Sequence, residues 1–138
     1  MFSIETDRSK RLLVIGLAGH VNKQDVREAA EEVCKVLEDV TPGFRVLTDF
    51  RWLESIRPSA APHIAQMMEA IIDKQVGLVV SVVSDPGKDV VLNVLSHFRY
   101  GSEVQIVTFE KLADALEKLM EEDRKLGNQE RRSEIDQL

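Results

Sequence analysis

The stretch over residues 46–61, VLTDFRWLESIRPSAA, constrains the fold of this chain more than any other. An apolar, strand-like run ends at Asp49, a short irregular link follows over residues 51–57, and a helix begins around Pro58 and Ser59. α/β domains place polar groups in this order at the carboxyl edge of a parallel sheet, where such folds usually bind their ligands. The stretch therefore predicts an architecture and a place for a binding site, but no particular chemistry.

Length and composition are those of one ordinary globular domain. A chain of 138 residues, 43% hydrophobic and 30% charged, buries enough surface to fold without a disulfide or a metal. The net charge of -6 argues against nucleic acid as a partner, since a phosphate backbone requires a basic surface. The apolar runs are far shorter than the ~20 residues of a membrane span, and the N-terminus lacks a signal-peptide pattern. We therefore expect a cytoplasmic protein with no membrane span.

Hydrophobic periodicity predicts the order of the secondary-structure elements. Strands are expected at residues 2–5, 11–17, 44–49, 77–84 and 103–107. Helices are expected at residues 22–40, 59–74 and 88–97, and from residue 108 onward. This order predicts a single α/β domain with a four- or five-stranded, mostly parallel (mixed) sheet and about four helices. The side chains expected in its core are Leu13, Ile15, Leu47, Val80, Val82 and Ile106.

Two further patterns mark the ends of helices. Asn22, followed three residues later by Asp25, resembles the capping box of the first helix. Beyond residue 120 the periodicity fades into a charged segment with few apolar side chains. We therefore expect a domain over residues 1–120, followed over residues 121–138 by a charged helix extension or a flexible tail that folding does not need.

The order of elements and three stretches on it resemble the STAS domain, in particular its SpoIIAA-like (anti-sigma-factor-antagonist-like) branch. These stretches are the first hairpin with Gly19 behind it, residues 46–50, and residues 79–119 with Pro86 in a turn. The resemblance covers about residues 2 to 120. It implies a SpoIIAA-like fold and a non-enzymatic regulatory role in which the domain binds a protein partner.

One departure from that pattern bears on function. Sporulation-type antagonists begin the second helix with an Asp-Ser-Ser/Thr-Gly run, whose hydroxyl a cognate kinase phosphorylates. Here the corresponding run is Arg57-Pro58-Ser59-Ala60, with Pro58 at the usual acceptor position. We therefore expect no phospho-switch and interpret Ser59 as a helix cap. SpoIIAA-like relatives share their fold with lipid-carrying CRAL-TRIO domains, so a carrier of a small lipid or anion is the alternative function.

The surface expected to bind a partner surrounds the start of the second helix. It consists of Asp49, Arg51, Trp52, Arg57, Pro58 and Ser59. Trp52 has two interpretations: it covers the core beside this helix, or it is exposed between two arginines as a binding hot spot. An exposed patch around Trp52 would favour the partner-binding module. A cavity lined by Met67, Ile71 and Val94 would favour the carrier.

A second candidate site lies at the turn before the expected third helix. It consists of Ser84, Asp85, Gly87 and Lys88. Free backbone N–H groups at a helix start can hold an anion, although an ordinary Asp-capped turn has the same sequence pattern. Asp49 and Asp85 both follow strands, so they form either a pair of carboxylates for acid–base chemistry or two turn-stabilising side chains.

Other chemistries find no support in the sequence. His20, His63 and His97 lie in three separate elements without metal-ligand spacing. No serine lies in a nucleophile elbow. We expect no metal, no cofactor and no enzymatic constellation. A protein partner is the leading expectation, and a homodimer and a small apolar or anionic ligand remain open.

Overall fold

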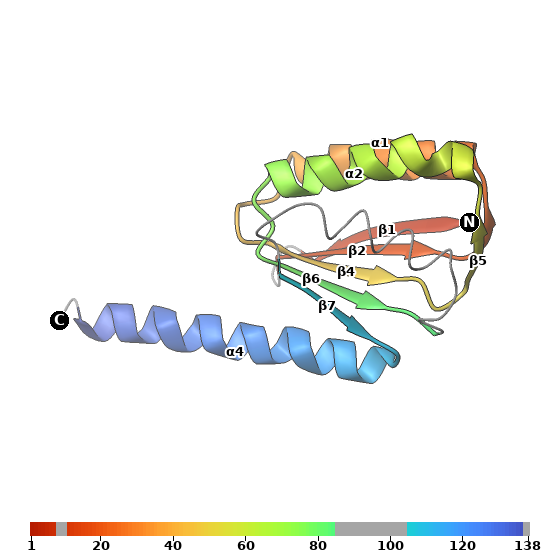
Figure 1. The fold of residues 1–138 in the computed structure, drawn as a ribbon. Helices are drawn as coiled ribbons and strands as arrows, with labels where there is room; N and C mark the ends of the chain where they lie inside the picture. The colour runs from red at the N-terminus through yellow and green to blue at the C-terminus, as the bar shows by residue number, and fades with distance from the viewer. Residues whose placement is uncertain (8–10, 85–104, 137–138) are drawn as a thin grey trace.

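A five-stranded mixed sheet forms the centre of the chain in the computed structural model, which describes residues 1–7, 11–84 and 105–136 (Figure 1). Its strands are β1 (Phe2–Asp7), β2 (Leu12–Leu17), β4 (Arg45–Asp49), β6 (Leu78–Val82) and β7 (Gln105–Phe109). They lie in the order β1-β2-β4-β6-β7. The β1–β2 pair is antiparallel, and the other neighbours are parallel. The predicted mixed, mostly parallel α/β sheet is confirmed.

Helices cover both faces of this sheet. Helices α1 (Lys23–Leu37) and α2 (Ala61–Asp73) pack together on one face, and α4 (Leu112–Asp136) lies on the other (Figure 1). The capping box of α1 is present: the Asn22 side chain accepts a hydrogen bond from the Asp25 N–H at 2.8 Å, and the Asp25 carboxylate accepts one from the Asn22 N–H. Among the described residues there are three α-helices where about four were predicted, and the helix expected at residues 88–97 lies outside them.

The alternation of side chains along the strands divides the core into two layers. Val46 and Val79 belong to the layer under α1 and α2. Leu47 and Val80 belong to the layer under α4, with Ala115 and Leu119 of that helix. Of the six predicted core residues, Leu13, Ile15, Leu47, Val80 and Val82 are buried. Ile106 is only half-buried, because β7 is an edge strand of the sheet.

Two short strands lie where the sequence suggested a turn and an irregular link. β3 (Gly19–Val21) and β5 (Leu53–Ile56) pair in parallel to form a separate two-stranded sheet. The Gly19 N–H donates to the Trp52 carbonyl at 2.7 Å, and the Arg57 N–H donates to the Val21 carbonyl at 3.0 Å. Gly19 has a φ of 72°, a conformation that glycine adopts at little cost. The link is therefore ordered because its backbone groups find partners in β3.

A buried arginine joins α4 to the central strand. Arg45 is buried in β4, and its Nη1 donates to the Leu119 carbonyl at 2.9 Å. Helix α4 continues without interruption to Asp136, and ion pairs of Lys125 with Glu121 and Glu122 stabilise its surface. The division into a domain over residues 1–120 and a dispensable segment after it stays a prediction. None of the helices in the described part of the chain is long and apolar enough to span a bilayer.

Replacing Val80 with Asp tests the central position of β6. Val80 is fully buried between β4 and β7, so an aspartate there would carry a charge with no partner. We expect the variant to lose several kcal/mol of unfolding free energy and to be largely unfolded at room temperature. Gln105→Asp, at an exposed position on β7, is the control and should melt close to the unmodified chain. Thermal melting followed by circular dichroism compares them, and a V80D midpoint within a few degrees of that control would contradict this placement of β6.

Candidate partner-binding surface

The carboxyl end of β4 carries an ion pair between Asp49 and Arg51 that fixes the direction of the following turn. The Asp49 carboxylate accepts hydrogen bonds from Arg51 through the backbone N–H at 3.2 Å, through Nε at 2.9 Å and through Nη2 at 2.9 Å. The guanidinium therefore contacts both carboxylate oxygens. This hydrogen bonding lowers the pKa of Asp49, while partial burial opposes the change. The Asp49 carboxylate is thus a turn-stabilising group that is ionised at neutral pH.

Trp52 is exposed, contrary to the interpretation that it covers the core. Its exposed fraction is 68%, and the Arg51 guanidinium carbon lies 5.6 Å from the centre of its ring. The neighbouring Phe50 and Leu53 are buried and close the core at this point instead. Because the Trp52 carbonyl is held by Gly19, the backbone is ordered while the indole remains outside. The second interpretation, an exposed Trp beside a cation, is the one that matches the structure.

A small, mostly apolar hollow lies beside Trp52. It has a volume of about 120 Å³ and is lined by Met1, Phe2, Ser3, Gly16, Leu17, Ala18, Asp49 and Trp52. Gly16 is one of its lining residues, and a Cβ there would lie 2.7 Å from the Ser3 hydroxyl oxygen, so that Ser3 would have to shift. A hollow of this size holds one side chain of a partner rather than a whole small-molecule ligand.

The start of the second helix is exposed as expected, but Ser59 does not cap it. Arg57, Pro58 and Ser59 are all exposed. Residues Pro58–Ala60 form a short 3₁₀ turn, η1, before α2, and no side chain caps either helix. The interpretation of Ser59 as a cap is therefore wrong. The turn closes instead through its backbone, with the Ala60 N–H donating to the Arg57 carbonyl at 2.9 Å.

Pairing of β3 with β5 brings together three polar side chains that the sequence did not connect. His20 lies opposite Ser55 in this small sheet. Its Nδ1 is 2.7 Å from the Ser55 hydroxyl oxygen, and its Nε2 is 2.9 Å from a carboxylate oxygen of Glu54. Because both strands are very short and lie in stretches interpreted as connections, no periodic signal in the sequence could have placed these residues together.

Only part of the second predicted site can be placed. The exposed Ser84 donates from its hydroxyl to the Arg51 carbonyl at 3.0 Å, which ties the end of β6 to the turn after β4. Asp85, Gly87 and Lys88 lie outside the described residues. The candidate anion site, with its alternative of an ordinary Asp-capped turn, therefore stays a prediction, as does the role of Asp85 beside the turn-stabilising Asp49.

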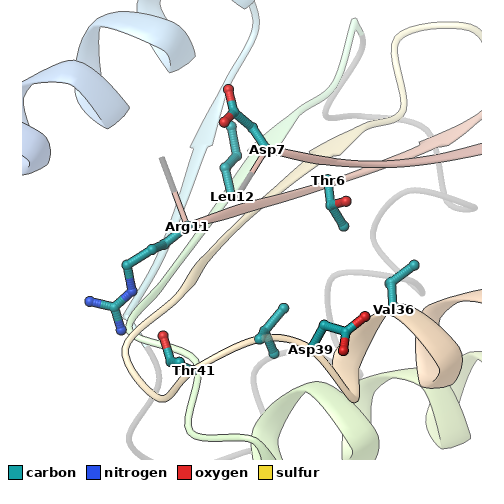
Figure 2. A pocket seen from close by; sticks show the side chains of 8 residues that line it. Thr6, Asp7, Arg11, Leu12, Val36, Asp39 and Thr41 are labelled. Carbon is teal, nitrogen blue, oxygen red and sulfur yellow. The ribbon is translucent and has the colours of Figure 1, made fainter. Parts of the chain in front are cut away.

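A larger hollow lies at the other end of the sheet, away from every predicted site residue. It has a volume of about 310 Å³ and is lined by Thr6, Asp7, Arg11, Leu12, Val36, Asp39, Val40 and Thr41 (Figure 2). Thr6 comes from β1 and Asp39 from the chain just after α1 (Figure 2). Arg11 donates from its guanidinium to the Pro42 carbonyl, which links the start of β2 to the segment before β4. Within the residues described, no three His, Cys, Asp or Glu side chains are grouped to hold a metal.

Several solved structures have the same fold as this chain. An uncharacterized protein of the DUF3478 family with a SpoIIAA-like fold, from Shewanella loihica PV-4, is 20% identical with a TM-score of 0.62, covering 86% of this chain and 93% of its own. The anti-sigma factor antagonist SpoIIAA in its unphosphorylated form is 13% identical with a TM-score of 0.61, covering 87% and 98%. An anti-sigma factor antagonist from Mycobacterium paratuberculosis is 12% identical with a TM-score of 0.58, covering 87% and 95%.

These matches confirm the resemblance to SpoIIAA-like STAS structures at the level of the fold. No protein-family model matches the sequence. No curated protein is significantly similar to it.

The Asp49–Arg51 ion pair forms a clamp at the end of β4, and replacing Asp49 with Asn tests it. Because the pKa of Asp49 is lowered in the folded chain, the pair stabilises the fold above the ordinary aspartate pKa of about 3.9 and loses that effect as the pH falls through the lowered value. At neutral pH we expect Asp49→Asn to lower the free energy of unfolding by about 1 kcal/mol. The difference should shrink toward zero in strong acid.

Urea unfolding at a series of pH values from neutral down to pH ~2 measures this difference. Glu69→Gln, at an exposed position on α2, is the control and should change stability by less than about 0.5 kcal/mol. A D49N difference that is absent at neutral pH, or that grows in acid, would show that the clamp does not stabilise the turn.

Proposed function

We propose that this chain is a cytoplasmic, non-enzymatic regulatory module of the STAS type that binds a protein partner through the surface around the start of α2. The partner surface consists of Asp49, Arg51, Trp52, Arg57, Pro58 and Ser59. The observation that carries the proposal is the exposed indole of Trp52 beside an arginine that is itself held in place. Trp and Arg are the residue types that most often dominate the binding energy of protein interfaces.

This surface is already well ordered before a partner binds, which favours a tight interaction. Arg51 is already fixed by Asp49, and the backbone of Trp52 is fixed by Gly19. Because fewer bonds must be immobilised on association, less conformational entropy is lost. The adjacent hollow of about 120 Å³ supplies a recess for one partner side chain. The surface thus combines an exposed aromatic side chain on an ordered backbone with a pocket beside it, and Arg51 lies against the indole.

The fold of the chain agrees with such a role. Two of the similar solved structures are named anti-sigma factor antagonists. At 12% and 13% identity these likenesses support the fold and do not identify a partner for this chain.

A lipid or anion carrier is the weaker candidate. Met67 and Ile71, which would line its cavity, are buried in the core layer under α1 and α2. Val94 lies outside the described residues. The two hollows described above are lined by other side chains. No observation therefore favours the carrier over the partner-binding module.

Replacing Trp52 with Ala tests the proposed surface directly. We expect W52A to lose at least about 30-fold in affinity for the partner, which corresponds to the roughly 2 kcal/mol of an interface hot spot. The partner is identified by capture from the native host on the immobilised, unmodified chain, and its affinity is then measured for each variant. Met120→Ala removes another exposed apolar side chain, 54% exposed on α4, and should bind normally. Equal binding by W52A and M120A would place the interface elsewhere.

The absence of a phospho-switch is a separate prediction. Ser59 is exposed, follows Pro58 and lacks the acidic residue two positions before it, where Arg57 lies. We expect protein purified from the native host to be unmodified at Ser59. Intact-mass analysis with peptide mapping decides the point. A substantial species that carries one phosphate group on Ser59 would contradict the prediction and support a partner-switching mechanism of the sporulation type.

A further inference from the structure

The contacts of His20 determine which of its ring nitrogens carries the proton in the neutral ring. A carboxylate only accepts hydrogen bonds, so the contact of 2.9 Å from Nε2 to Glu54 requires that Nε2 bear the hydrogen. The neutral ring then has Nδ1 free to accept, and the Ser55 hydroxyl at 2.7 Å must be the donor. In this neutral form the serine proton points at a base that a carboxylate orients.

This is the arrangement by which proteins activate a serine: a nucleophile within hydrogen-bond reach of a base, and a third group that orients the base. Such constellations are recognised by geometry and roles rather than by position in the sequence. We propose that Ser55 is an activated nucleophile that accepts an acyl group from small activated carboxylic esters. His20 is the base in this reaction, and Glu54 is a positioning residue that acts through His20.

The step is a transfer of one acyl group to the chain. The Ser55 hydroxyl oxygen attacks the acyl carbon of the ester while its proton passes to His20 Nδ1. The bond between the acyl carbon and the leaving oxygen then breaks, and the leaving alkoxide takes the proton from Nδ1. The products are an acyl ester on Ser55 and the free alcohol, so His20 returns to its starting state and no further reactant is needed.

The surroundings of Ser55 suit a modification site. Ser55 is half-exposed, and the side chains of His20 and Glu54 are 77% and 62% exposed, so an ester can reach all three. Arg57 follows Ser55 by two residues in extended backbone, which places it on the same side of the strand. Its exposed cation can stabilise the negative charge that develops on the acyl oxygen.

The test uses p-nitrophenyl acetate as the acyl donor and the full chain. We expect one acetyl group on Ser55, found by intact mass and peptide mapping. Ser55→Ala should abolish labelling at this position. His20→Ala should slow it at least about 10-fold, since a positioned general base contributes a hundredfold or more. Thr108→Ala removes an exposed hydroxyl on β7, outside every proposed site, and should be labelled on Ser55 like the unmodified chain. Melting curves confirm that each variant is folded.

The role of Glu54 needs a readout other than rate. Nitrogen NMR of the imidazole should show the Nε2–H tautomer of His20 in the unmodified chain and a mixture of tautomers in Glu54→Ala, together with slower acetylation of Ser55. Absence of acetyl on Ser55, or equally fast labelling of Ser55 in H20A, would overturn the proposal. An unchanged His20 tautomer in E54A would remove Glu54 from it.

Discussion

Burial of β4 on both faces is the constraint on which the rest of the structure depends. Val46 packs under α1 and α2, and Leu47 packs under α4, so the strand has no face that tolerates water. The polar groups on it are therefore satisfied within the protein: the Thr48 hydroxyl pairs with that of Ser81 at 2.7 Å, and Arg45 donates to the Leu119 carbonyl. These contacts fix the neighbouring strand and the helix on the far face relative to β4.

The proposed partner surface follows from how the chain leaves this buried strand. At Asp49 the strand reaches the edge of the sheet, and the clamp with Arg51 sets the direction of the turn. Phe50 and Leu53 then fill the end of the core, which leaves Trp52 between them in sequence but outside in space. Its indole is exposed because its neighbours already occupy the apolar space and its backbone is held by β3.

The sequence predicted those features of the fold that leave a periodic pattern of residues within one segment. The mixed sheet, the burial of β6 on both faces and the capping box at Asn22 each depend on residue patterns along the chain, and the structure contains all three. It did not predict features that depend on contacts between distant short segments. The pairing of β3 with β5 involves strands of three and four residues. Such strands are too short for an alternating pattern to separate them from loops.

The local structure over residues 49–59 was predicted only in part, and its role as a binding site stays a proposal. The expected order of strand, acidic residue, turn and helix is present, with a short strand, β5, within the link. The exposure of Trp52 depends on which neighbours fill the core, and the turn before α2 closes through backbone bonds rather than through Ser59. Both outcomes depend on three-dimensional packing, which a residue pattern in one segment does not predict. The contact between His20 and Ser55 has the same origin.

The proposed partner surface depends most directly on the exposure of the Trp52 side chain, and the chain contains a single tryptophan with which to measure it. Fluorescence of Trp52 in the folded protein, with acrylamide as a quencher, reports on that residue alone. We expect emission at the wavelength of tryptophan in water and quenching nearly as efficient as in the urea-unfolded chain. A blue-shifted emission that acrylamide barely quenches would mean that Trp52 is buried, and the proposed partner surface would not exist.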